Sequence, residues 1–221
     1  ARVPYGNRSR ETLLQYARQD MRFLSGFDLK AVVIACGTVS TNCLEDLQAE
    51  SGLPVIGVVD PACRRAAALS GTGRVGLAAT RASVASGAYE RTFRRLDPRL
   101  EVYSLACPLF VPLVEEGRCR PGDRVIETVA AEYLLPLRER GVDTLVLGCT
   151  HYPLLTDVIG QIMGPGSCSP SGTGWPAGPR AGPATTPVTA PRTSSGWPPC
   201  SWGRTWPARS RRLIYPNTEG L

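Results

Sequence analysis

Long apolar segments are missing from this sequence of 221 residues, and so are the common metal-binding motifs. No apolar run reaches about 18 residues, so no transmembrane helix is expected. Eight cysteines are too few for a disulfide scaffold, and one histidine without a Cys-x-x-Cys pair gives no zinc motif. Residues 1–6 have no signal-peptide pattern. Because 43% of the residues are hydrophobic and 20% are charged, a wholly disordered chain is also excluded.

Acidic residues are almost absent from the last quarter of the chain. Residues 165–221 contain a single acid, Glu219, together with more than half of the 20 prolines and all four tryptophans. This segment therefore carries most of the net charge of +6, and residues 1–164 are close to neutral. Its composition predicts a low-complexity, disordered tail. A basic binding protein with a nucleic-acid or membrane partner would have to use this tail alone, and we expect neither partner.

Strands and helices alternate through residues 1–164, which predicts an α/β fold with parallel sheets. Short apolar or β-branched runs predict the strands, and apolar residues at helical spacing predict the helices. The expected strands are residues 29–36, 53–59, 74–79, 101–106 and 144–148. The expected helices are residues 10–23, 38–50, 61–69, 84–96, 108–116 and 124–140.

Two cysteines occupy equivalent places in this pattern. Cys36 follows the apolar run AVVIA, and Cys149 follows TLVLG. Each is followed by small polar residues, at the end of a strand where open α/β sheets bind their ligands. Amide groups at the start of a following helix lower the pKa of a nearby thiol, so both cysteines are candidate reactive groups. Their equivalent positions predict one paired site.

The segments around these cysteines resemble the glutamate racemases, of the aspartate/glutamate racemase superfamily. Six blocks carry the resemblance, in order along the chain: residues 1–6 (ARVPYG), 33–38 (VIACGT), 54–58 (PVIGV), 79–84 (ATRASV), 106–115 (ACPLFVPLVE) and 148–155 (GCTHYPLL). The resemblance implies two pseudo-symmetric parallel-sheet domains with the active site in the cleft between them. We expect domain boundaries at residues 1–59 and 60–164, with the tail at 165–221 outside the resemblance.

The resemblance also implies the chemistry. Racemases of this family use no cofactor and no metal: one cysteine removes the α-proton of the amino acid and another returns a proton on the opposite face. By resemblance Cys36 and Cys149 have these roles, His151 assists Cys149, and Glu115 is a carboxylate near the site. The residues that correspond to substrate-binding positions are Pro4, Tyr5, Gly6, Gly37, Thr38, Ser83, Thr150 and His151.

The sequence departs from the family pattern in three places. Gly37 replaces the asparagine that follows the first cysteine in the family, which puts the choice of substrate in question. The first strand of the family and its Asp-Ser-Gly loop would precede Ala1, so the first domain is expected to be incomplete and the chain truncated at its N-terminus. The closing segments of the family do not follow Gly164, and our hypothesis is that residues from about Pro165 onward are translated out of frame or come from an altered gene.

The sequence therefore predicts a cytoplasmic bacterial enzyme that converts L-glutamate to D-glutamate for peptidoglycan, with a homodimer as one expected assembly. One alternative is a racemase of a related amino acid such as aspartate, which Gly37 favours. A second is a catalytically inactive fragment of the family. A change in the circular dichroism of L-glutamate during incubation with the protein would distinguish glutamate racemisation from these two alternatives.

Overall fold

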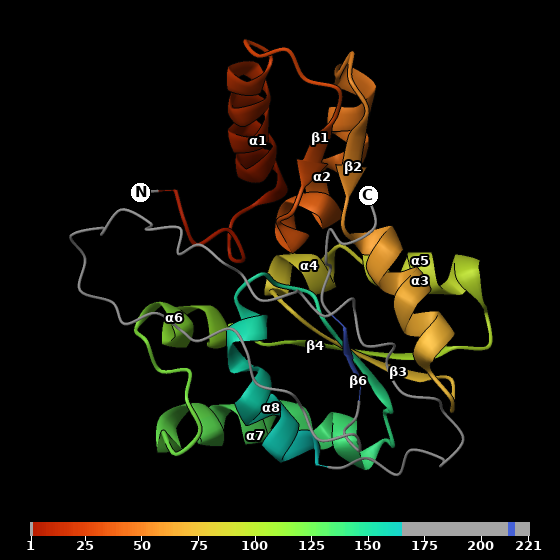
Figure 1. The fold of residues 1–221 in the computed structure, drawn as a ribbon, viewed down its shortest axis with the longest axis vertical. Coiled ribbons are helices and arrows are strands. Elements are labelled where there is room, and N and C mark those ends of the chain that lie inside the picture. Colours follow the sequence, from red (N-terminus) through yellow and green to blue (C-terminus); the bar gives the residue numbers. More distant parts are fainter. Residues whose placement is uncertain (1, 165–211, 215–221) are drawn as a thin grey trace, which may run out of the picture.

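The computed structural model of the protein describes residues 2–164 and 212–214. The chain begins with helix α1 (Arg10–Leu24), strand β1 (Val32–Ile34), helix α2 (Gly37–Glu50) and strand β2 (Val55–Gly57). Ser9 begins α1 by accepting a hydrogen bond from the backbone N–H of Thr12, as a serine N-cap does. The two strands pair in parallel, and α1 and α2 pack on each other over a small apolar core (Figure 1).

The second part of the fold is larger and carries a four-stranded sheet. Its elements are α3 (Val59–Leu69), β3 (Arg74–Ala79), α4 (Arg81–Ala85), α5 (Ala88–Leu96), β4 (Glu101–Ala106), α6 (Phe110–Glu115), α7 (Arg124–Glu139), β5 (Thr144–Leu147), the 3₁₀ helix η1 (Tyr152–Leu155), α8 (Thr156–Met163) and β6 (Arg212–Ile214). The strand order is β4-β3-β5-β6, and all pairs are parallel. The predicted α/β class with parallel sheets is confirmed.

Both faces of this sheet are buried by helices. Along β5, Leu145 and Leu147 belong to an apolar cluster with α6, α7 and α8, whereas Val146 belongs to a cluster with α3 and α5. Because side chains alternate across a strand, the two clusters lie on opposite faces. This explains why β5 is buried at all four positions and, after Thr144, is a continuous apolar run.

Three segments differ from the sequence-based prediction. The helix expected over residues 84–96 is broken in two, because Gly87 adopts a left-handed conformation with φ +65° between α4 and α5. Helix α8 was not predicted. Residues 212–214 lie within the expected disordered tail, yet they form β6 beside β5. The rest of the tail prediction falls on residues 165–211 and 215–221, which lie outside the described part of the chain.

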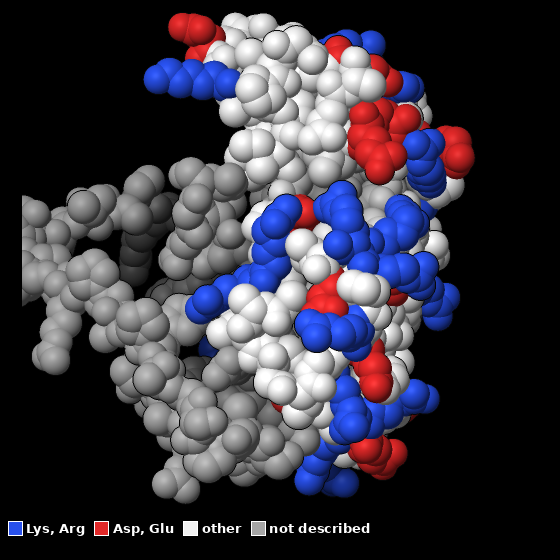
Figure 2. Space-filling view, turned by 90° about the vertical axis from the view of Figure 1, so that its right-hand side faces the viewer, with Lys and Arg blue, Asp and Glu red and all other residues white. Residues whose placement is uncertain are grey.

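The surface over α3 and α5 carries charges of both signs. Figure 2 shows arginines gathered on this face, with acidic side chains among them. Asp60 on α3 accepts from Arg64 at 2.5 Å and from Arg95 of α5 at 2.7 Å. These exposed ion pairs stabilise the fold little, but they divide the basic surface into smaller patches. Among the helices that the structure describes, none has the length and apolar character needed to cross a bilayer.

Candidate active site

Cys36 lies at the junction of β1 and α2. It is the N-cap residue of α2, and its half-buried thiol makes no capping hydrogen bond. Because the first amides of a helix have no intrahelical acceptor, the start of α2 presents N–H donors near this thiol. The structure thus places Cys36 at the start of a helix that follows a strand, as the sequence pattern predicts.

Cys149 follows β5 and is buried, with 8% of its surface exposed. Burial raises the pKa of its thiol to about 11, although the backbone N–H groups of His151 and Tyr152 act in the opposite direction. The nearby amides thus lower this pKa as expected, but desolvation of the thiolate outweighs them, and the net shift is upward. At neutral pH the residue carries its proton.

The two cysteine-bearing strand ends touch through glycine. A β-carbon built on Gly37 would lie only 2.2 Å from the carbonyl oxygen of Gly148, so no side chain fits there. Gly37 directly follows Cys36, and Gly148 directly precedes Cys149. Gly37 offers no side chain to a ligand, and its position is explained by this backbone contact. Negative charge on Cys36 also contributes to the raised pKa of Cys149.

His151 connects Cys149 to a carboxylate. Its Nδ1 lies 3.9 Å from the Cys149 sulfur, and its Nε2 lies 2.6 Å from the Oε1 of Glu115. Glu115 is the last residue of α6, and its side chain is 63% exposed, against 31% for His151. When His151 Nε2–H donates its hydrogen bond to Glu115, the Nδ1 lone pair faces the sulfur. The structure thus links Cys149, His151 and Glu115, which were all expected near the site, through successive side-chain contacts.

The loop of Pro4, Tyr5 and Gly6 lies on the Cys36 side of the site, where Tyr5 and Cys36 pack against the same apolar cluster. Tyr5 is half-buried, and the pKa of its hydroxyl is raised by burial, with smaller effects of Asp20 and Cys36. Gly6 accepts a hydrogen bond from the N–H of Ala82 at 3.1 Å. A β-carbon on Gly6 would lie 2.8 Å from Cβ of Thr80, so only glycine allows this approach.

A buried row of hydroxyl groups joins the two parts of the fold. Thr38 Oγ1 of α2 lies 2.9 Å from Thr80 Oγ1, which in turn donates to Ser83 Oγ at 3.0 Å. Thr41 Oγ1 donates to the same serine at 3.4 Å. Thr38 and Ser83 were singled out from the sequence, whereas Thr80 and Thr41 were not. One sequence feature could have identified Thr80, because threonine is a favoured N-cap residue. Thr80 is the N-cap of α4, and its side chain accepts a hydrogen bond from the N–H of Ser83.

The candidate residues differ in burial. Ser83, within the hydroxyl row, is fully buried. Thr150 is exposed beside Cys149, and Pro4 is exposed at the start of the loop.

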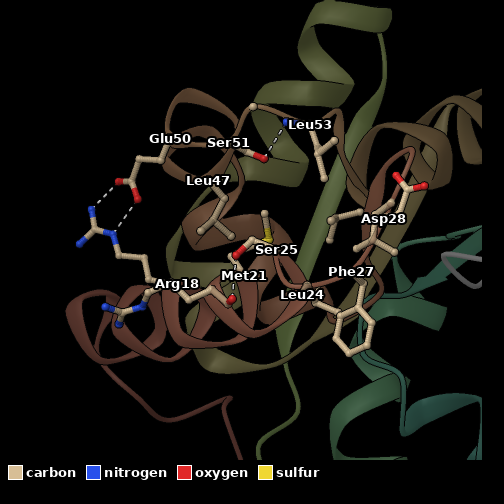
Figure 3. Close-up of a pocket in the computed structure, with 14 residues that line it drawn as sticks. Arg18, Met21, Leu24, Ser25, Phe27, Asp28, Leu47, Glu50, Ser51 and Leu53 are labelled. Atoms are coloured by element: carbon tan, nitrogen blue, oxygen red, sulfur yellow. Dashed lines mark hydrogen bonds and ion pairs between the residues drawn. The ribbon is translucent and has the colours of Figure 1, made fainter.

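A cavity in the described part of the chain lies elsewhere. It measures about 750 Å³ and is formed by the end of α1, the residues after it and the ends of α2 and β1. Figure 3 shows the Arg18–Glu50 ion pair on one side of it and Phe27 and Asp28 on the other. None of the candidate residues lines it. The candidate site is therefore identified by side-chain chemistry and by the meeting of strand ends, not by this cavity.

Comparison with known proteins relates the fold to a family. The model of the family "Asp/Glu/Hydantoin racemase" matches residues 4–166. A glutamate racemase of Geobacter metallireducens is 50% identical over 164 residues, which cover 74% of this chain and 60% of that protein. One of Corynebacterium kroppenstedtii is 46% identical, with coverage of 74% and 56%. The chain thus spans about three fifths of the length of these curated relatives.

Solved structures give the same relationship. A glutamate racemase isoform of Bacillus anthracis matches with a TM-score of 0.69 and 39% identity, covering 74% of this chain and 60% of that one. The enzyme of Francisella tularensis, solved in complex with D-glutamate, matches with a TM-score of 0.67 and 37% identity, covering 72% and 59%. The match over residues 4–166, together with these structures, shows that the chain belongs to the Asp/Glu/Hydantoin racemase family.

Proposed function

We propose that this chain interconverts L- and D-glutamate, with Cys36 and Cys149 as the two acid/base groups. The observation that carries the proposal is the contact of Gly37 with Gly148, because it brings the strand ends of both cysteines together. Inversion of a tetrahedral carbon needs a base on one face and an acid on the other, and a pair of opposed cysteines supplies both. The named relatives are glutamate racemases, and one of the solved structures holds D-glutamate.

The proposed reaction transfers one proton on each face of the substrate. A thiolate takes the α-proton, so an S–H bond forms as the Cα–H bond breaks, and the electron pair stays on the α-carbon beside the carboxylate. The thiol on the other face then gives its proton to that carbon and becomes the thiolate. With a pKa of about 11, Cys149 is protonated at neutral pH, which suits it to be the donor in the resting site. We assign the role of base in that state to Cys36.

The opposite direction requires Cys149 to lose its proton. His151 is the group suited to take it, since its Nδ1 lies 3.9 Å from the sulfur and Glu115 holds the other ring nitrogen. Glu115 stabilises the imidazolium that forms, as a carboxylate behind a histidine does in hydrolases. His151 and Glu115 thus act together to let Cys149 alternate between thiol and thiolate.

Replacement of Glu115 by glutamine tests the orientation of His151. The glutamine amide can donate to Nε2, which leaves the Nδ1 proton directed at Cys149 and removes the acceptor. We expect kcat to fall about 10- to 100-fold, the usual effect of losing a carboxylate that orients a functional histidine. The measurement is the rate of racemisation from each enantiomer. The control is Glu116→Gln, on the neighbouring exposed residue, and equal rates in the two variants would show that Glu115 has no such role.

The hydroxyl row and the loop of Pro4, Tyr5 and Gly6 are the proposed substrate-binding elements, with Thr38 and Thr150 next to the two cysteines. The domain boundaries at residues 59 and 60 remain part of the proposal. So do a cytoplasmic location, a homodimeric assembly and the supply of D-glutamate to peptidoglycan.

A second candidate is a racemase of a related amino acid, for which aspartate is the first choice. It is favoured by Gly37, which removes a side chain from the position after Cys36 and brings the strand ends into contact. A shorter substrate needs less separation between these ends.

Circular dichroism of the full chain with L-glutamate, D-glutamate and both enantiomers of aspartate tests both candidates. We expect the glutamate signal to decay to zero from either enantiomer. Decay with aspartate alone would favour the second candidate. Proton NMR in D₂O adds a more sensitive measurement, and the absence of α-proton exchange with every substrate would contradict both.

A further inference from the structure

Tyr89 places an unpartnered hydroxyl between the two cysteine-bearing strand ends. The residue lies in the first turn of α5 and is fully buried. Its hydroxyl oxygen has no hydrogen-bond partner among the residues that the structure describes. A β-carbon built on Gly148 would lie 3.3 Å from this oxygen, and one built on Gly37 would lie 3.8 Å from it. The hydroxyl therefore sits where the two glycines meet.

The apolar surroundings of the ring do not explain the hydroxyl. The Tyr89 ring packs in the cluster of α3, α5 and the central strands, with neighbours such as Leu77, Ala79 and Phe93. A phenylalanine would fill the same space without leaving a polar atom unpaired. A buried hydroxyl without an acceptor is destabilising. Its presence in a folded protein therefore suggests that an acceptor forms during function.

A deprotonated thiol is such an acceptor. The pKa of Tyr89 is raised mainly by burial, and further by negative charge on Cys63, Cys149 and Cys36. The hydroxyl thus lies within the electrostatic reach of both site cysteines. Of the two strand ends, it lies nearer to that of Gly148 and Cys149.

The thiolate of Cys149 would be stabilised by a nearby hydrogen-bond donor. Its thiolate is desolvated, which is the principal cause of its raised pKa. The groups that face it are Cys36 across the strand ends, the backbone N–H groups of His151 and Tyr152, the His151 ring with Glu115 behind it, and the buried side chains of Cys107, Tyr152 and Tyr89. Within this set, the Tyr89 hydroxyl is a buried oxygen donor that has no hydrogen-bond partner among the residues that the structure describes.

We propose that Tyr89 is a positioning residue of the two-cysteine site, whose hydroxyl donates a hydrogen bond to the thiolate of Cys149 each time that thiol gives up its proton. The inference rests on the proposed role of Cys149. No covalent bond is made or broken by Tyr89; its O–H stabilises the charged sulfur and is released when the sulfur is protonated again.

The test is Tyr89→Phe in the full chain, with no substrate present. Each cysteine is alkylated with iodoacetamide over a range of pH, and the rate at Cys149 is followed by mass spectrometry of its peptide. Since the thiolate is the reacting form, loss of a donor slows alkylation below the pKa. We expect Cys149 to react about 3- to 10-fold more slowly in the variant at pH 9, with Cys36 unchanged. Tyr133→Phe is the control, because its ring packs on Phe110 in the other apolar cluster.

Thermal unfolding separates this role from a structural one. Tyr89→Phe removes an unpaired buried hydroxyl, so we expect an unchanged or higher Tm. A clear fall in Tm, an effect on Cys36 in place of Cys149, or the same alkylation profile as Tyr133→Phe would each overturn the proposal. Because alkylation needs no turnover, its result stands apart from the activity: a chain that fails to racemise any amino acid refutes the proposed function, whereas an unaltered Cys149 profile refutes the role of Tyr89.

Discussion

Cys149→Ala is expected to abolish racemisation, with a fall in kcat of about 10³-fold or more, and Cys36→Ala is expected to do the same. Each cysteine is the sole proposed acid/base group on its face of the substrate, and removal of such a group costs on the order of 10²- to 10⁴-fold. His151 is proposed to exchange a proton with Cys149 and not with the substrate, so it is not expected to replace the lost thiol. The measurement is circular dichroism from each enantiomer.

Isotope exchange gives the same two variants a sharper signature. A single remaining cysteine can remove the α-proton of one enantiomer and return a deuteron from solvent to the same face. We therefore expect each variant to exchange the α-proton of only one enantiomer without inverting it, and the two variants to select opposite enantiomers. Cys43→Ala is the control, because Cys43 is buried in the core between α1 and α2. Racemisation that persists in either Cys36→Ala or Cys149→Ala would contradict the two-base mechanism.

Local sequence patterns were sufficient to predict most of the helices and strands. Strands β3 and β4 begin and end at the predicted residues, since their apolar runs are bounded by polar and turn residues. The break between α4 and α5 was missed because the helical pattern of residues 84–96 continues across Gly87, and only the observed positive φ shows that the helix stops. Strand β6 was missed because residues 212–214 lie in a segment whose composition suggests disorder, whereas its pairing depends on β5, far away in the chain.

The residues of the candidate site could be named from the sequence, but their burial and their neighbours could not. The sequence indicated Cys36, Cys149, His151 and Glu115, and the structure brings the last three into one hydrogen-bonded chain. Burial is a property of the packed molecule, so the raised pKa of Cys149 could not be derived from its place before a helix. Tyr89 could not be identified from the sequence for the same reason. It belongs to α5, its hydroxyl approaches the site through the core, and no local sequence motif indicates this contact.

Gly37→Asn is the second change for which we expect a large effect. The new β-carbon would start 2.2 Å from the Gly148 carbonyl oxygen, which belongs to the backbone at the end of β5 and cannot rotate away as a side chain would. The strand ends would have to separate, and overpacking of this kind costs about 1–3 kcal/mol of stability. Displacement of one cysteine by about 1 Å from the other is enough to lower a rate about 100-fold. We therefore expect both a lower Tm and a racemisation rate reduced by about two orders of magnitude.

Gly52→Asn is the matched control, since nothing lies within 4 Å of a β-carbon built at Gly52 and its φ does not favour glycine. Thermal unfolding and circular dichroism of both variants give the comparison. The family resemblance makes the outcome informative in either direction, because an asparagine follows the first cysteine in the family pattern. If Gly37→Asn unfolds at the same temperature as Gly52→Asn and racemises glutamate faster than the natural chain, then the strand ends stand apart in solution and the asparagine amide contributes to substrate binding. If it loses both stability and activity, then the Gly37–Gly148 contact sets the distance between Cys36 and Cys149, and the site of this chain is built around a closer approach than a side chain at residue 37 allows.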